Sequence, residues 1–346
     1  MPNVRSDPPA ARQTTAPSTA GALALDELLV DFVGGRDGGV AALVVRNGTT
    51  SSAATGVANA AGDPVTPVTP FRVGSVSKPF VATMILQLVD EGRVELEQPL
   101  STYLPDTPIG AEVTIRALLS HRSGLPNYTD IDAAISDTLA DRGRQFTPEE
   151  IVGYVNSVPP SAADQRFAYS NTNYILLGQL IEQLDGTDLN TALRNRITGP
   201  LRLDATRFAT GDDPTPDGLA AGWSPGILNV DPDADYASIA SGAWAAGALV
   251  STVGELATFL AALFAGKFIS EESLAAMTST GPEGYGLGLG AAGFGPGQSG
   301  YGHGGAVFGY TAIIAIDPAT GDSVIIVTNN DELVADELAA RIIENW

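Results

Sequence analysis

Ser75 and Lys78 lie three positions apart, where a short strand-like segment runs into a long apolar-periodic one. This context predicts Ser75 in the first turn of a helix, with the Lys78 amine one turn further on beside its hydroxyl. The helix N-terminus would also favour negative charge on the serine oxygen. The pair suits a nucleophilic serine, but Ser-x-x-Lys is also the pattern of a capped helix with a solvated lysine.

The identity of the base matters here, because a lysine takes a serine proton only when desolvation or a cationic neighbour lowers its pKa. Arginine cannot replace it, since arginine is never deprotonated. Of the 18 basic residues in the chain only two are lysine, Lys78 and Lys267. One of the two therefore stands where a base is needed.

Tyr169 and Asn171 form a second candidate group, just before a well-defined helical segment. A phenol near a cationic lysine can be held partly ionised, and could then act as the base for Ser75. The Asn171 amide can orient a substrate amide. A helix N-cap with a packed tyrosine would give the same triplet.

The third candidate group is the glycine-rich segment Gly302-His303-Gly304-Gly305-Ala306. Its glycines would let a substrate backbone lie close to a strand edge, and the Ala306 amide could join that of Ser75 in an oxyanion hole. His303 could assist proton transfer to the leaving group or hold the network together. A glycine-rich loop with a structural histidine is the simpler alternative.

Composition narrows the class of protein. The 346 residues, 44% of them hydrophobic, suffice for one large domain or two small ones, and no stretch approaches the length of an apolar membrane span. The net charge of −22 argues against binding to nucleic acid or to anionic membrane surfaces. We expect a monomer that acts on a small molecule or short peptide.

The chain has no cysteine and only two histidines, His121 and His303. Disulfides, cysteine nucleophiles, thiolate metal sites and multi-histidine zinc sites are therefore excluded, and we expect no cofactor and no metal. Two acidic segments, Asp212–Asp217 and Asp231–Asp235, are predicted to be exposed loops in preference to calcium sites.

The chain begins with a segment, residues 1–21, that is rich in Pro, Ala, Ser and Thr and lacks an apolar run. It is predicted to be a disordered tail and not a signal peptide. The sequence as written thus predicts a cytoplasmic protein, or a secreted one if an export signal has been removed.

Periodicity predicts strands at both ends of the chain and helices between them. The expected elements are helices 22–32, 80–89, 115–119, 148–156, 174–184, 189–197 and 332–346, and strands 40–46, 49–57, 70–73, 285–290, 311–316 and 323–328. This order predicts an α/β (α+β) fold in which both termini build one antiparallel sheet flanked by helices. The sheet part would hold about residues 22–80 and 240–346 of a domain at 22–346, and an inserted all-helical part about 81–239, with the active site between them.

Taken together and in this order, the three groups resemble the motifs of the serine penicillin-recognising enzymes. More narrowly, the chain resembles the serine D-Ala-D-Ala carboxypeptidases of the class C β-lactamase type, with their relatives the D-aminopeptidases, D-amino-acid amidases and small esterases. The resemblance extends from Leu25 to the C-terminus. It includes further stretches: 71–75 (FRVGS), 88–92 (LVDEG), 120–125 (SHRSGL), 169–173 (YSNTN) and 284–289 (GYGLGL).

This resemblance implies a β-lactamase/penicillin-binding-protein-like fold and a role for each residue. Ser75 would form the acyl-enzyme, and Lys78 and Tyr169 would share the proton transfers as a coupled pair, with the base unassigned. Asn171 would bind the substrate amide. The remaining roles concern the third group and one further position: His303 would occupy the place of the third-motif Lys or His, Ala306 would supply the second oxyanion amide, and His121 would be structural and not catalytic.

The chain departs from the carboxypeptidases at the third group. Gly304 and Ala306 stand where those relatives carry threonines, and no Lys or Arg occurs from Phe268 to Ala340 to bind a C-terminal carboxylate. His-Gly-Gly instead resembles the third motif of D-aminopeptidases. Trp223 and Trp244 could line the cleft and favour an apolar or flat acyl group, or could be core residues.

Three functions follow as hypotheses. The first is a serine hydrolase or transacylase that cleaves an amide or ester of a small molecule or short D-amino-acid-containing peptide through Ser75. The second is a D-Ala-D-Ala carboxypeptidase acting on cell-wall peptides. The third is a penicillin-fold binding or sensor protein without turnover.

Overall fold

The computed structural model describes residues 19–160, 166–210, 215–224, 228–229, 236–294 and 299–345. Most of the predicted tail, the whole of the acidic segment 231–235 and part of the acidic segment 212–217 lie outside these residues. The first helix, α1 (Thr19–Val33), starts three residues inside the predicted tail. No helix within the described residues combines the length and the apolar character needed to cross a bilayer.

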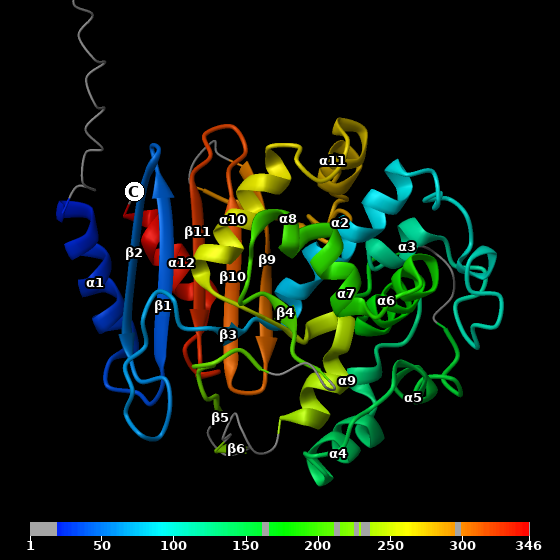
Figure 1. Ribbon diagram of the computed structural model, residues 1–346, viewed down its shortest axis with the longest axis horizontal. Helices are drawn as coiled ribbons and strands as arrows, with labels where there is room; N and C mark the ends of the chain where they lie inside the picture. Colours follow the sequence, from blue (N-terminus) through cyan, green and yellow to red (C-terminus); the bar gives the residue numbers. More distant parts are fainter. Residues whose placement is uncertain are drawn as a thin grey trace, which may run out of the picture.

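A six-stranded antiparallel sheet forms the centre of the fold, built from both ends of the chain as predicted (Figure 1). Its strands are, in spatial order, β2 (Thr49–Gly56), β1 (Gly39–Arg46), β11 (Ser323–Thr328), β10 (Tyr310–Ile316), β9 (Ser299–Val307) and β8 (Gly290–Gly293). The Asn47-Gly48 turn between β1 and β2 has positive φ at both residues, which a tight hairpin requires.

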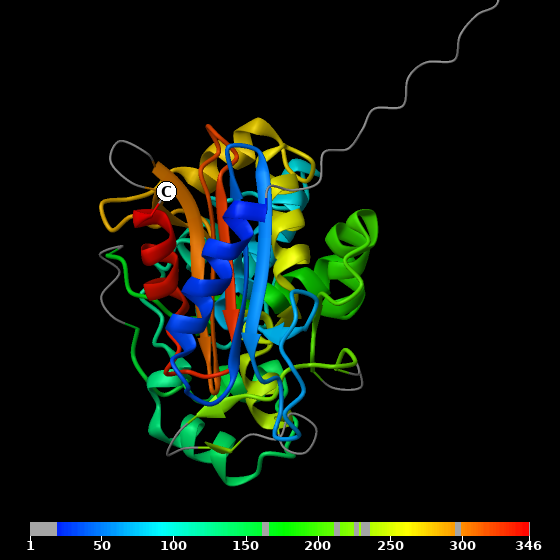
Figure 2. The same cartoon turned by 90° about the vertical axis from the view of Figure 1, so that its left-hand side faces the viewer.

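Helices cover both faces of this sheet, so its central strand β11 is buried along its whole length. The helices α1 and α12 (Ala335–Glu344) lie side by side on one face, against Val40 and Ala42 of β1 (Figure 2). The helix α10 (Val253–Phe264) packs on the other face. The helix α2 (Ser77–Asp90) is buried between the sheet and the helical part.

The helical part lies on the far side of α2 from β1 and β2 (Figure 1). Its helices are α3 (Ile115–Leu119), α4 (Asp132–Ala140), α5 (Pro148–Gly153), α6 (Asn171–Asp185), α7 (Leu189–Leu193), α8 (Gly199–Leu201) and α9 (Ala237–Gly247). A small sheet in the order β3 (Phe71–Arg72), β7 (Leu249–Ser251), β4 (Arg207–Phe208) runs beside it. The remaining α-helices and strands among the described residues are β5 (Trp223–Ser224), β6 (Leu228–Asn229) and α11 (Glu271–Thr278).

Two predicted elements are wrong in detail. Residues 285–289 form a bent segment and not a strand, with an isolated bridge between Tyr285 and Gly290, because Gly288 has a left-handed φ of +78° that does not fit an extended strand. The strand β8 starts only at Gly290. The predicted helix 189–197 changes at Arg194 into a short π-helical segment, Arg194–Thr198.

The contact between α2 and α10 gives a prediction about stability. The rings of Phe80 and Phe259 stack with centroids 3.6 Å apart, and both side chains are fully buried. Replacing Phe259 by Ala should lower the free energy of unfolding by about 3–5 kcal/mol in urea titrations. Val68→Ala, at a side chain that is 77% exposed, should change it by less than about 0.5 kcal/mol. Equal effects of the two substitutions would contradict the packing described.

Candidate active site

Ser75 lies in a single 3₁₀ turn, Gly74–Val76, directly before α2, and so slightly ahead of the predicted helical turn. The Ser77 hydroxyl fixes this turn, because it donates to the Gly74 carbonyl at 2.7 Å and accepts from the Leu249 amide of β7 at 3.0 Å. The turn is therefore anchored to the small sheet as well as to its own helix.

Two side chains converge on the Ser75 hydroxyl oxygen. Lys78 Nζ lies 2.9 Å from Ser75 Oγ, and the Tyr169 hydroxyl donates to Ser75 Oγ at 2.9 Å. Tyr169 is far from the other two in sequence and stands just before α6. The structure thus brings the first two sequence groups together around one oxygen atom.

The Lys78 amine is completely buried and has two more partners. Its Nζ atom lies 2.8 Å from Asn171 Oδ1 and 2.7 Å from the Ala246 carbonyl oxygen, and no carboxylate forms an ion pair with it among the described residues. Burial holds the pKa of Lys78 well below its usual value. Ala246 follows a kink in α9 at Trp244, whose φ of 34° and ψ of −125° are unusual for a residue with a side chain.

The position of Tyr169 depends on His121. The two rings stack with centroids 4.1 Å apart, and His121 Nδ1 accepts a hydrogen bond from the Ser170 amide at 3.1 Å. Burial lowers the pKa of His121 to about 2, so its ring is neutral. The Tyr169 side chain is partly open to solvent, but desolvation by the surrounding protein still raises the pKa of the phenol. Tyr169 is therefore a neutral phenol at ordinary pH and can donate a hydrogen bond.

His303 lies in β9, with both ring nitrogens occupied. Its Nδ1 donates to the Gly304 carbonyl at 2.5 Å, so Nε2 is the accepting nitrogen, and it accepts from the Tyr285 hydroxyl at 2.9 Å. Burial, with the nearby Lys78, lowers the pKa of His303 to about 3. This geometry favours the network-holding role over proton transfer. Sequence reasoning missed Tyr285, although it stands in one of the stretches that carry the resemblance.

The edge of β9 comes very close to the Ser75 turn. A side chain at Gly305 would lie 2.0 Å from the Val73 carbonyl oxygen, and one at Gly74, where φ is +51°, would lie 2.8 Å from the Ala306 nitrogen. The β9–β10 hairpin closes at Val307 and Tyr310, so the next pair, Ala306 and Thr311, points its amides away from each other. The Ala306 amide therefore faces the same side as the Ser75 turn, which is the arrangement of an oxyanion hole.

A cavity of about 440 Å³ opens beside Ser75, Asn171 and Ala306. Its other walls come from the η3 turn (Tyr128–Asp130), α4, α9, the end of β9 and the loop after β11: Tyr128, Thr129, Ile135, Thr138, Ile239, Gly242, Ala243, Ala246, Gly247, Val307, Phe308 and Asp331. Neither Trp223 nor Trp244 lines it. Trp244 packs against Gly178 of α6, and Trp223 lies on β5.

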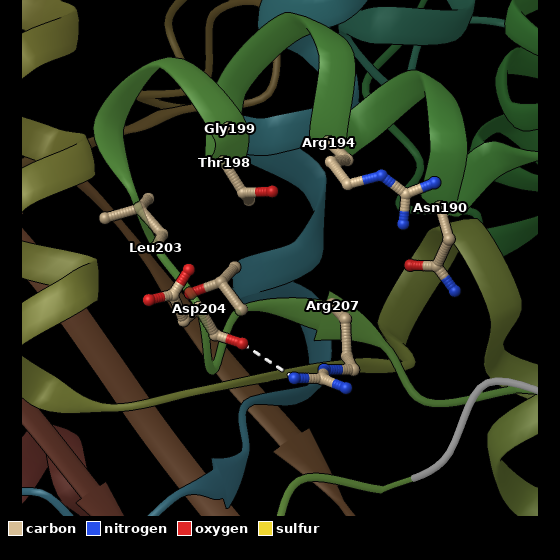
Figure 3. Close-up of a pocket in the computed structure, with 8 residues that line it drawn as sticks. Asn190, Arg194, Thr198, Gly199, Leu203, Asp204 and Arg207 are labelled. Carbon is tan, nitrogen blue, oxygen red and sulfur yellow. Dashed lines mark hydrogen bonds between the residues drawn. The ribbon is translucent and has the colours of Figure 1, made fainter.

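A second cavity, of about 220 Å³, is separate from these residues (Figure 3). It is lined by residues of α7, α8, β4 and the segments between them, among them Arg194, Asp204 and Arg207. The Arg207 guanidinium donates to the Asp204 carbonyl oxygen at 2.6 Å. None of the predicted catalytic residues contributes to this cavity. In the part of the chain that the structure describes, no group of three or more His, Asp or Glu side chains could hold a metal ion.

The close approach of β9 gives a second prediction. Gly305→Ala should force the strand edge away from the turn and slow acylation of Ser75 by an activated aryl ester about 100- to 1,000-fold, the usual effect of losing one oxyanion donor. Gly293→Ala in β8 is the control, because nothing lies within 4 Å of the added side chain. Stopped-flow acylation rates measure both variants, and a normal rate for Gly305→Ala would contradict the proposed oxyanion hole.

Comparison with known proteins agrees with this geometry. The structure of the D-amino acid amidase from Ochrobactrum anthropi SV3 in complex with D-phenylalanine is similar, with a TM-score of 0.80 and 27% identity over 93% of this chain and 97% of the amidase. The D-stereospecific amidohydrolase from Streptomyces sp. gives a TM-score of 0.77 and 29% identity, over 89% of this chain and 94% of the other.

Curated relatives match over shorter segments. Penicillin-binding protein 4 of Amycolatopsis lactamdurans is 32% identical over 179 residues, which are 48% of this chain and 43% of the relative. The chain spans about half, or less, of the length of the first curated relatives it matches. The family model described as Beta-lactamase matches residues 25–344, nearly the whole chain. The chain therefore belongs to the Beta-lactamase family of serine hydrolases and penicillin-binding proteins.

Proposed function

We propose that this protein is an acyl-enzyme hydrolase or transacylase that cleaves an amide or ester bond through Ser75. The observation that carries the proposal is the placement of a buried amine and a phenol, each 2.9 Å from the Ser75 oxygen. In this proposal residues 22–346 form one catalytic domain that acts as a monomer, with the cleft between its sheet part and its helical part.

The partners of Lys78 support its assignment as the base. Asn171 Oδ1 and the Ala246 carbonyl oxygen can only accept hydrogen bonds, so they take both hydrogens of a neutral amine. The lone pair of the amine then remains for the third partner, the Ser75 hydroxyl. Tyr169 donates to the same oxygen and, because its pKa is raised, serves as a proton donor and not as a tyrosinate base.

The reaction follows from these contacts. Ser75 Oγ attacks the carbonyl carbon while its proton moves to Lys78 Nζ, and the Ser75 and Ala306 amides stabilise the oxyanion. The carbon–nitrogen or carbon–oxygen bond then breaks, the leaving group takes a proton from the Tyr169 hydroxyl, and the Lys78 ammonium returns a proton to Tyr169. Water, or a competing amine or alcohol, then attacks the acyl-enzyme and gives a proton to Lys78 Nζ. The ester bond to Ser75 breaks and the Lys78 ammonium returns that proton to Ser75 Oγ, which restores the free hydroxyl.

The surroundings of Gly304 argue against a carboxypeptidase. The two carboxylate oxygens of Asp336 lie 3.5 Å and 3.6 Å from the place where a Gly304 side chain would start. A free C-terminal carboxylate bound beside this strand would face that like charge, with no lysine or arginine in the sequence from 268 to 340 to oppose it. The amidase neighbours support an uncharged leaving group, such as the ammonia of an amide.

A substrate panel with intact-mass detection tests the proposal. D-amino-acid amides, aryl esters, β-lactams and a D-Ala-D-Ala peptide are each offered to the protein, with and without an added amine nucleophile. We expect Ser75 to be acylated by amides or esters and released, and the D-Ala-D-Ala peptide to be the poorer substrate. Full turnover by Ser75→Ala would refute the proposal, acylation without release would favour the binding or sensor hypothesis, and fast peptide cleavage would favour the carboxypeptidase.

The lysine assignment gives a separate prediction. Lys78→Arg keeps a long basic side chain but cannot accept a proton, so kcat/KM should fall at least about 1,000-fold at every pH. The wild-type kcat/KM should fall as the pH decreases through the lowered pKa of Lys78, because the protonated amine has no lone pair. The control is Lys267→Arg, at the only other lysine, which is exposed. Appreciable activity of Lys78→Arg would assign the base to another group.

A further inference from the structure

The cavity beside Ser75 has an apolar wall with one charged side chain in it. Among the residues that line it, only Asp331 carries a charge, and most of the others are aliphatic, aromatic or glycine. Lys78 is buried and contacts no part of Asp331. An acyl group bound in this cavity would therefore meet hydrophobic contacts and a single carboxylate.

Asp331 is held firmly by the loop after β11. Its Oδ2 accepts from the Ser224 hydroxyl at 2.5 Å and from the Gly309 amide at 3.2 Å. The preceding residues are buried and fixed, since Asn329 Nδ2 donates to the Ala221 carbonyl and Asn330 Nδ2 to the Asp37 carbonyl, each at 2.7 Å. The carboxylate is thus positioned before any ligand binds.

The other oxygen of this carboxylate, Oδ1, accepts no hydrogen bond from the residues that the structure describes, and none of their lysines or arginines forms an ion pair with Asp331. If the Asp331 side chain served only to accept hydrogen bonds from Ser224 and Gly309, an asparagine could take its place. A half-buried carboxylate in the wall of a cavity, with one oxygen that takes no hydrogen bond from the described residues, can receive a cation from outside the chain.

The location of Asp331 also suits the acyl part of a substrate. Gly309, its partner, follows the oxyanion residue Ala306 by three positions, so the backbone between their nitrogens spans at most roughly 10 Å. Ala306 and the turn with Gly309 thus lie at one end of β9. His303 and Gly304, with Asp336 beside Gly304, lie towards the other end. Asp331 is therefore a feature of the acyl pocket and not of the leaving-group side.

We propose that Asp331 selects acyl groups that carry a protonated amine on an apolar body, such as the acyl group of a hydrophobic D-amino acid amide. The inference rests on the proposed function and names its substrate class. Asp331 acts on specificity: its Oδ1 accepts hydrogen bonds from the substrate ammonium, while the apolar wall contacts the side chain. Charge-assisted hydrogen bonds of this kind contribute about 10- to 100-fold in binding.

Calorimetry in a Ser75→Ala background tests the inference without turnover. The ligands are D-phenylalanine amide and its neutral analogue N-acetyl-D-phenylalanine amide, at about pH 6.5, where the free amine is protonated. Adding Asp331→Asn keeps an acceptor for Ser224 and Gly309, and should weaken the free amine about 10- to 100-fold with little effect on the acetylated ligand. Glu332→Gln, the same charge change at an exposed neighbour, should change neither.

Kinetics of Asp331→Asn in the otherwise wild-type protein provide the second measurement. KM for D-phenylalanine amide should rise by the same factor while kcat and the hydrolysis of a neutral aryl ester stay within about threefold. Equal loss on charged and neutral substrates, or no loss on either, would overturn the role of Asp331 even if Ser75 is acylated normally. Discrimination in calorimetry without any acylation of Ser75 would instead refute the proposed function and leave the amine site standing.

Discussion

The whole site depends on a lysine amine buried without a counter-charge. Lys78 contacts two carbonyl-type oxygens and a serine, and desolvation keeps its pKa low enough for the amine to be a base. The folded protein carries a cost for this. Since the unfolded chain binds a proton at Lys78 more readily, the Lys78 contribution to stability becomes less favourable as the pH falls below the unfolded value and is most unfavourable once the pH is below the lowered, folded value.

Most of the surrounding structure can be understood as holding that amine and its serine in place. The helix α2 carries both residues, α6 supplies Asn171, and the kinked α9 supplies the Ala246 carbonyl. His121 and His303 are neutral at ordinary pH and act through packing and hydrogen bonds, so neither adds a positive charge beside the amine. The polar groups of the site thus form a network in which almost every donor and acceptor has a definite partner.

Sequence reasoning found the parts of the site that depend on local pattern. Ser75 and Lys78 are one helical turn apart, and Tyr169 and Asn171 stand at the start of a clear helix, so spacing made them candidates and the resemblance gave them their catalytic roles. Tyr285, Asp331 and Asp336 follow no such spacing, because only the folded sheet brings them to the site. Tyr285 hydrogen-bonds to His303 of β9, Asp336 of α12 lies beside Gly304, and Asp331 stands in the loop after β11. Trp223 and Trp244 were chosen for size and amphipathic character, properties that do not distinguish a cleft residue from a core residue.

The pairing of the central sheet determines when the protein can fold. Val40 of β1 pairs with Thr328 of β11, so this core cannot be completed until Thr328 has left the ribosome. Contacts between such distant segments form slowly, since a large loop must close before they stabilise the chain. Until then β1 has its hairpin partner β2 but lacks β11 along its other edge, and an exposed apolar strand edge of this kind is prone to aggregation.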